Sequence, residues 1–283
     1  MTRTTFKSRL RKRLARAPLR YLAAPLFDGL VRTELSVIRC WDEATRSRPA
    51  SASEYKQVTA IIKTFERPHL LERLVASLER CFPGLAIIVA DDSRTPSRLP
   101  RVQTVELPFD SGVSAGRQAA LDAVRTQLTW VLDDDFVVYR GTRLGLALRA
   151  LEREPELDLV GGRVVDLPLF SSRGSARNLV YPTPASPRLT LGTRLGEVIV
   201  CDKVPNFFVA RTDKLRQVGW DARLKRMDHA DFFTRARGVL AVGFLARFAC
   251  LHAQAPFDSA YMARRDDYVA DEALLRARYF LEG

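Results

Sequence analysis

The chain has 283 residues, of which 47% are hydrophobic, enough for one large domain or two small ones with a proper core. Its net charge of +12 is of the kind found in nucleic-acid binders, but the first twenty residues hold eight of the 45 Lys and Arg residues and none of the 33 Asp and Glu residues. The remaining 263 residues carry 37 basic against 33 acidic groups, about +4, which argues against a nucleic acid as the main partner.

Cysteine usage and hydropathy exclude two further classes of protein. The four cysteines are scattered without a CxxC pair, so they form neither a zinc knuckle nor a disulfide framework. No uninterrupted apolar run reaches the length of a transmembrane helix, and the short run Leu22–Phe27 contains Pro25. We therefore expect a soluble protein of a reducing compartment, the cytoplasm, without a signal peptide.

Residues 1–50 are predicted to form a basic helical extension. Phe6, Leu10 and Leu14 are spaced four residues apart, and Lys and Arg residues cover the remaining faces. Such a helix can lie on an anionic membrane, which would hold residues 1–20 at the inner membrane face, or it can be a solvated tail. A second helical pattern, from Phe27 to Trp41, is expected to pack on the main domain or on a partner subunit.

The segment Arg46–Ser53 is rich in small and polar residues and is the expected linker to a domain over residues 55–283. From Gln57 onward, short apolar runs alternate with helical patterns, which predicts an α/β fold with a mostly parallel sheet flanked by helices. In the first half, 57–140, we expect strands at 58–63, 85–90, 102–107 and 128–132 and helices at 68–81 and 117–124. In the second half, 141–283, we expect a strand at 157–165 and a long loop at 171–187.

Polar side chains follow three of the predicted strands directly. They are Lys63 with Thr64, Asp91 with Asp92, and the triplet Asp133, Asp134 and Asp135. Ligands of parallel sheets bind at the carboxyl ends of the strands, so these groups are expected to meet at one site. Asp133 and Asp135 should share one face, about 6–7 Å apart, and three crowded carboxylates favour a divalent cation beside them.

Several common reaction types have no support in the sequence. No GxGxxG follows the first strand and no GxxxxGK[ST] is present, so dinucleotide and P-loop sites lack their phosphate cradle. The three histidines do not form HExxH, and there is no GxSxG nucleophile elbow. The chemistry is therefore expected to depend on carboxylates.

The order of several motifs resembles a known family. TFERPHLLERLVASL, IIVADDS, DSGVSAGRQAAL, WVLDDDF, VPNFFVARTDKLRQVGWD and the HxDFF at His229–Phe233 are similar, in this order, to glycosyltransferases of the GT-A fold. More narrowly, they resemble the ganglioside-synthesising β-1,4-N-acetylgalactosaminyltransferases and their bacterial family 2 relatives. The resemblance covers about Val58 to His252, and the ordered set is more specific than its lone DxD.

The resemblance implies a UDP-sugar donor, with UDP-GalNAc favoured, and the hydroxyl of a glycan or glycolipid as acceptor. The residues implied to bind the nucleotide-sugar are Thr64, Arg67, Asp91, Asp92, Arg117, Asp133 and Asp134. For two of them a second interpretation stays open, since Asp92 can cap a turn with Ser93 and Arg117 can be a surface side chain.

The same resemblance implies Mn²⁺ or Mg²⁺ between the carboxylates and the diphosphate of the donor. Asp135 would be the direct ligand, Asp133 would contact ribose, the metal or a metal-bound water, and His252 would complete the site. A buried structural histidine is the alternative for His252, which follows the apolar run ARFACL.

For the transfer step, Asp231 is the expected general base, and attack opposite the leaving UDP would invert the anomeric configuration to a β-glycoside. Asp228 and Asp231 also have the spacing of a capping pair, and Asp228 is the next candidate base. The alternative to an enzyme is a non-catalytic nucleotide-sugar or glycan binding module in which the acids hold a structural cation.

Overall fold

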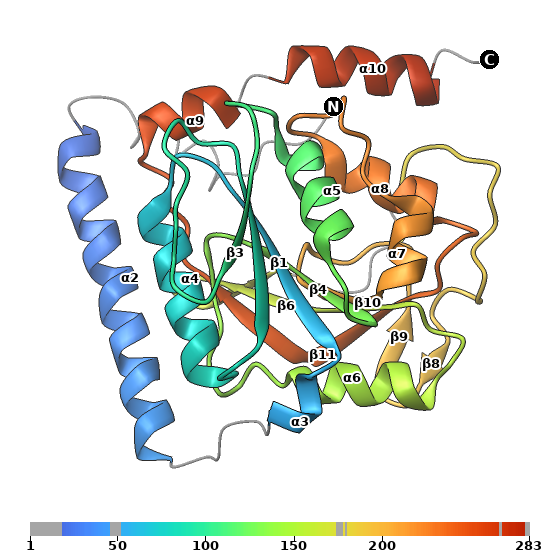
Figure 1. Cartoon of the computed structure of the whole chain (residues 1–283), viewed down its shortest axis with the longest axis horizontal. Helices are drawn as coiled ribbons and strands as arrows, with labels where there is room; N and C mark the ends of the chain where they lie inside the picture. Colours follow the sequence, from blue (N-terminus) through green and yellow to red (C-terminus); the bar gives the residue numbers. More distant parts are fainter. Residues whose placement is uncertain (1–18, 46–51, 174–177, 179, 266–267, 281–283) are drawn as a thin grey trace.

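A computed structural model of the chain describes residues 19–45, 52–173, 178, 180–265 and 268–280 (Figure 1). Its first half alternates strands and helices as the sequence pattern predicts. The elements up to the acidic triplet are α2 (Leu19–Ala44), α3 (Ala52–Tyr55), β1 (Val58–Thr64), α4 (Pro68–Cys81), β2 (Ala86–Asp91), β3 (Gln103–Glu106), α5 (Val113–Ala123) and β4 (Leu128–Asp133).

The second half is less regular than the first. It contains β5 (Phe136–Val137), α6 (Leu144–Arg153), β6 (Leu159–Asp166), β7 (Ser171–Arg173), β8 (Arg194–Leu195), β9 (Val198–Val200), β10 (Phe208–Arg211), α7 (Thr212–Val218), α8 (Asp228–Ala236), β11 (Val242–His252), α9 (Ser259–Arg265) and α10 (Val269–Phe280). The long loop predicted at 171–187 begins with a strand, since Ser171–Arg173 pairs with β6 as β7. The described residues from there to β8 contain neither helix nor strand.

All strands of the described residues belong to one sheet, whose main path runs β3-β2-β1-β4-β10-β6-β11-β9-β8. The pairs β2/β3, β1/β2, β1/β4 and β6/β11 are parallel, and β10 lies antiparallel between β4 and β6. Together with the helices on both sides, this arrangement confirms the predicted α/β fold of the GT-A kind (Figure 1). The carboxyl ends of β1, β2 and β4 meet at one edge, as expected.

One element begins earlier than predicted. The helix expected from Arg117 starts at Val113, one turn upstream, because Gly112 turns the chain at φ +99° and leaves the following residues free to be helical. The shift brings Gly116 into the helix, where a Cβ would lie 2.3 Å from Cδ of Lys63. The absence of a side chain at Gly116 therefore allows Lys63 to extend along α5.

The hydrophobic core has two layers, one on each face of the sheet. Side chains of α4 and α6 pack on one face, and side chains of α5, α7 and α8 pack on the other. Trp130 of β4 is fully buried among aromatic rings, with Phe207 and Phe248 at centroid distances of 5.9 and 6.0 Å. This packing fixes the direction of β4 and hence of the acidic triplet at its end.

The N-terminal extension is described only from residue 19 onward. Helix α2 runs along one edge of the molecule (Figure 1), and Val31 packs with Val137, Leu167 and Leu251 of the main domain. The second helical pattern, from Phe27 to Trp41, is expected to pack on the main domain or on a partner subunit, and this contact is with the main domain. The predicted basic helix at 6–17 and most of the predicted linker lie outside the described residues. In the part of the chain that is described, no helix has the length and apolarity needed to cross a membrane.

Candidate active site

A cavity of about 420 Å³ lies at the carboxyl ends of β1 and β4. The acidic triplet forms its floor, and residues from α5, α8, α9 and the end of β11 complete its walls. It is the place where a parallel sheet is expected to bind its ligand. Of the predicted site residues, the cavity is lined by Thr64, Arg67, Arg117, Asp133, Asp134, Asp135 and His252.

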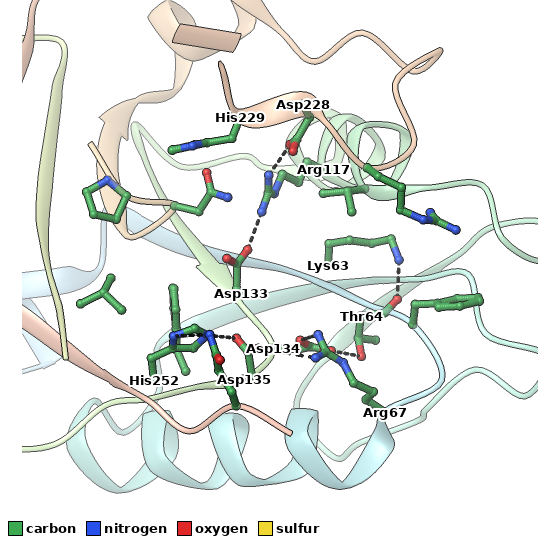
Figure 2. Close-up of a pocket in the computed structure, with 18 of the residues that line it drawn as sticks. Lys63, Thr64, Arg67, Arg117, Asp133, Asp134, Asp135, Asp228, His229 and His252 are labelled. Atoms are coloured by element: carbon green, nitrogen blue, oxygen red, sulfur yellow. Dashed lines mark hydrogen bonds and ion pairs between the residues drawn. The ribbon is translucent and has the colours of Figure 1, made fainter. Parts of the chain in front are cut away.

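Arg117 joins two carboxylates from opposite walls of the cavity. Its two terminal nitrogens donate separately, one to Asp133 at the end of β4 and the other to Asp228 at the start of α8 (Figure 2). Arg117 and Asp228 are both buried, so the guanidinium is a fixed positive charge inside the site and not a surface side chain. Burial raises the pKa of Asp228, although Arg117 acts in the opposite direction.

Asp134 has different partners from Asp133, and it shares one of them, Arg67, with Asp135, whose Oδ2 lies 3.5 Å from the guanidinium. Its carboxylate accepts a hydrogen bond from Thr64 Oγ1 at 2.8 Å and pairs with the guanidinium of Arg67. Burial raises the pKa of Asp134 to about 6 against the opposing effect of Arg67. Tyr261 of α9 stacks on Arg67 with 3.8 Å between the guanidinium carbon and the ring centroid. These contacts make Asp134, Thr64 and Arg67 one rigid unit.

Asp135 faces His252, which lies at the end of β11. The distance from Asp135 Oδ1 to His252 Nε2 is 3.2 Å, and the other ring nitrogen, Nδ1, is 2.7 Å from Asp166 Oδ1. Burial lowers the pKa of His252, but the two carboxylates outweigh it and raise that pKa to about 9. A carboxylate on the far nitrogen of a histidine is the usual support for a metal ligand, because it orients the ring and increases its basicity.

The sequence analysis did not identify Asp166 as a site residue. It ends the buried strand β6 in the same way as Asp133 ends β4, so the strand-end pattern contained the signal. Its role depends on the parallel pairing of β6 with β11, in which Asp166 and His252 are register partners. That pairing joins residues 86 positions apart and has no local trace in the sequence.

Asp91 and Asp92 are buried but do not line the cavity in the described part of the chain. The Asp91 carboxylate accepts hydrogen bonds from the backbone N–H groups of Ser93 and Ser97, at 2.9 and 2.8 Å, so the turn-capping role belongs to Asp91. Asp92 pairs with Lys63 and accepts the N–H of Gly112 at 2.8 Å. Lys63 itself lines the cavity, and thereby links Asp92 to it.

The two acids of α8 differ in what they face. Among the described residues, Asp228 lines the cavity and Asp231 does not. The fully buried carboxylate of Asp231 instead binds Arg235, Arg278 and the hydroxyl of Tyr279. This placement does not favour the expected role of Asp231 as general base, and it leaves Asp228 as the α8 carboxylate with access to a ligand.

The donor set fits a divalent cation that shares its coordination with a ligand. Asp135 and His252 offer one carboxylate and one imidazole in contact distance. Within the described ranges, no group of three or more Asp, Glu, His or Cys side chains is arranged to hold a metal ion by itself. Further oxygens would therefore come from water or a bound diphosphate, which is how Mg²⁺ is commonly held.

Residues 59–219 match the sequence family described as glycosyl transferase family 2, over more than half of the chain. The chain belongs to this family. It is 40% identical over 209 residues to β-1,4 N-acetylgalactosaminyltransferase 1 of Homo sapiens, and 35% identical over 197 residues to β-1,4 N-acetylgalactosaminyltransferase 2 of Mus musculus. These matches confirm the resemblance seen in the ordered motifs.

The matched regions cover 69% and 66% of this chain but only 39% and 37% of those two relatives. This family 2 chain therefore spans well under half the length of the curated relatives it matches. Among solved structures, residues 1–349 of S. aureus TarS align with a TM-score of 0.54 at 17% identity, covering 69% of this chain and 60% of that one. At this identity the likeness supports the fold, and a complex of the same protein with UDP-GlcNAc aligns with a TM-score of 0.52.

Proposed function

We propose that this family 2 member is a metal-dependent inverting glycosyltransferase that moves a hexose or N-acetylhexosamine from a UDP-sugar to a hydroxyl of a glycan or glycolipid. The observation that carries the proposal is the pair Asp135 and His252, supported by Asp166, inside the cavity at the ends of β1 and β4. The relatives named as N-acetylgalactosaminyltransferases favour UDP-GalNAc as donor, and the UDP-GlcNAc complex of TarS fits a UDP-sugar in this fold.

The charge of the cavity suits a nucleoside diphosphate. Its basic side chains are Lys63, Arg67, Arg117, Arg226 and Arg264. Arg67 and Arg117 are paired with carboxylates of the site, and Lys63 is paired with Asp92. Arg226, which pairs with Asp110, and Arg264 come from the rim formed by the loop before α8 and by α9. We place the diphosphate between this rim and Asp135, and the nucleoside towards Thr64, Asp91 and Asp92.

A metal ion would be held by Asp135 and His252, with Asp133 reaching it directly or through water or binding the ribose. When bound, Mn²⁺ or Mg²⁺ would offset the charge of the diphosphate against the carboxylates and so stabilise the departing UDP. The chain's own contribution is orientation. Asp166 fixes the ring of His252, and Asp134 is fixed by Thr64 and Arg67.

For proton removal from the acceptor hydroxyl we propose Asp228, with Asp231 as the competing candidate. Asp228 lies on the cavity wall opposite the triplet, where a base can act on the face of the sugar away from the leaving group. Arg117 positions its carboxylate through the shared ion pair. A single base on that face gives one displacement and inversion of configuration, so an α-linked donor yields a β-glycoside.

Turnover tests the proposed activity directly. Purified protein is screened by thermal shift against UDP-sugars with Mn²⁺, and the sugars that stabilise it are assayed for UDP release with glycan and glycolipid acceptors. We expect stabilisation by UDP-GalNAc or a similar UDP-hexose and acceptor-dependent release of UDP. Stabilisation without any release would instead support a non-catalytic nucleotide-sugar binding module.

We also propose that the basic segment 1–20 attaches the protein peripherally to anionic lipid at the cytoplasmic face of a membrane. Its eight Lys and Arg residues, with no acid, would each contribute about 1 kcal/mol near such a surface. Deleting residues 1–18 removes seven of the eight basic side chains and keeps α2, so it should abolish most of the salt-sensitive part of vesicle binding in a flotation assay. Equal flotation with and without the segment would refute this attachment.

A further inference from the structure

Helix α2 has three distinct sides along its 26 residues. One side packs on the main domain through Phe27, Val31, Leu35 and Ile38. A second side carries charges of both signs, Asp28, Arg32, Arg39 and Glu43, which suit water and sum to zero. The third side is apolar and exposed, and it is the one that the fold leaves without an explanation.

We call this third side the outer stripe of α2, and it consists of Leu22, Leu26, Leu30, Val37 and Trp41. The spacings of four, four, seven and four residues place these side chains on one face of the helix. Leu26 is 67% exposed and Trp41 is 70% exposed. Figure 1 shows α2 along the edge of the molecule, where one side of it faces away from the other elements.

A second apolar feature lies beside the outer stripe. The turn between β6 and β7 presents Leu169 and Phe170 to solvent, with Leu169 80% exposed. Both residues have positive φ, 75° and 48°, a conformation that large side chains rarely adopt. Maintaining two apolar side chains at a strained turn costs free energy, and such strain is commonly found at functional sites.

One hydrogen bond joins the two features. The backbone N–H of Leu169 donates to Glu34 Oε1 of α2 at 2.8 Å. Leu30 and Val37 lie about one helical turn on either side of Glu34, at the flank occupied by the outer stripe. The bond therefore holds the turn next to the flank of the outer stripe, so that both sets of exposed apolar side chains lie on the same part of the molecule. Soluble proteins rarely leave so much apolar surface uncovered.

The charge of the segment that precedes α2 in the sequence indicates what covers this apolar surface. Residues 1–20, which lead directly into α2, carry eight basic side chains and no acid. A second copy of the chain would bring the same positive charge and offers no complement to it, whereas a bilayer with anionic headgroups matches both the charge and the apolar stripe. Trp41, with an apolar body and a polar N–H, also suits the interface between headgroups and acyl chains.

We propose that the outer stripe of α2 and the β6–β7 turn dock on the surface of an anionic lipid bilayer, with α2 lying in the plane of the headgroups. This extends the lipid attachment proposed for residues 1–20, yet it concerns different residues and does not depend on sugar transfer. Two contacts are expected, a salt-sensitive one through the basic segment and a salt-resistant one through the apolar surface.

Vesicle partitioning of the full chain separates these contacts. The double variants Leu26→Ser with Val37→Ser and Leu169→Ser with Phe170→Ser are compared with Val269→Ser on α10, a control that is 73% exposed. On vesicles of phosphatidylcholine with phosphatidylglycerol, each double variant should lower the partition coefficient by about tenfold at high salt, and the control should leave it unchanged. Unchanged partitioning of both double variants would overturn the proposal. UDP binding of the same variants reports separately on the transferase site.

Trp41 provides a second test that needs no substitution. Trp130 and Trp220 are buried, so Trp41 is the tryptophan that brominated acyl chains can quench. We expect quenching on anionic brominated vesicles and none in a Trp41→Phe variant. A wild-type protein that floats fully without quenching would contradict the proposal. So would a stable dimer in sedimentation that Leu26→Ser with Val37→Ser dissociates, because a second copy would then cover the surface.

Discussion

At the scale of single residues, the site depends on side chains that are held by others. Arg117 holds Asp133 and Asp228, Asp166 holds His252, and Arg67 with Thr64 holds Asp134. Each pair is mostly buried, so removing one partner leaves an uncompensated group in a poorly solvated place, at a cost of about 3–5 kcal/mol. Conservative changes that keep the volume are therefore the informative ones.

The matched variants Asp228→Asn and Asp231→Asn distinguish the two candidate bases. If Asp228 is the base, Asp228→Asn retains UDP binding and loses transfer by about 10² to 10⁴ in rate, because the acceptor proton has no carboxylate to receive it. Asp231→Asn should mainly lower the melting temperature, since Arg235 and Arg278 lose a charged partner. The rate of sugar transfer and the melting temperature are measured for both variants. Full transfer by Asp228→Asn with a folded but inactive Asp231→Asn would restore Asp231 as the base.

The pH dependence of transfer should reflect the protonation of Asp228. Burial raises the pKa of Asp228 above its ordinary value of 3.8. A general base acts in its deprotonated form, so kcat/KM for the acceptor should fall as the pH decreases through this raised pKa. The profile is measured with donor and Mn²⁺ saturating, and Asp231→Asn should keep it. If the fall in kcat/KM at low pH shifts to a different pH in Asp231→Asn, the titrating base is Asp231 and not Asp228.

At the scale of elements, α10 holds the start of α8 in place. Asp271 of α10 accepts the backbone N–H groups of Lys225, Arg226 and Met227, at 3.1, 2.6 and 2.8 Å. Further along α10, Arg278 pairs with both Asp221 and Asp231. Through these contacts the C-terminal helix orients the segment that presents Asp228 to the cavity.

Removing the Asp271 carboxylate should therefore affect catalysis at a distance. We expect Asp271→Ala to lower stability by about 2–3 kcal/mol, because three N–H groups lose their acceptor. It should also lower both kcat and UDP affinity, because the same N–H groups position Arg226 of the rim as well as the start of α8. Glu272→Ala, at the exposed neighbouring position, is the control. Thermal unfolding and steady-state kinetics check both. Wild-type kcat and UDP affinity in Asp271→Ala would contradict the orienting role of α10.

The elements also show how far the sequence predicts the structure. Strand ends were predictable, since an apolar run followed by acids marks β4, and the meeting of Thr64, Asp133 and Asp135 follows from parallel pairing. The antiparallel insertion of β10 between β4 and β6 was not predicted, because strand order depends on contacts between distant segments. The same reason hid Asp166 beside His252 and α10 beside α8.

At the scale of the whole molecule, the family 2 domain places its cavity at the ends of the first strands, and the charge of the chain is concentrated in the segment before α2. This arrangement suggests separate roles for the sheet edge and for the N-terminal part of the chain. The sheet edge would bind the UDP-sugar, and α2 with the basic segment would bring the protein to a lipid surface where a glycolipid acceptor can be reached.

Calorimetric titration of UDP with and without a metal ion tests the proposed site most directly. With Mn²⁺ present we predict UDP binding by the wild-type protein, and addition of EDTA or the substitution Asp135→Ala should abolish it, because the diphosphate would then face the carboxylates without a cation between them. Thermal unfolding confirms that the variant is folded. UDP affinity that is the same in Mn²⁺ and in EDTA would contradict a metal-dependent site at Asp135 and His252.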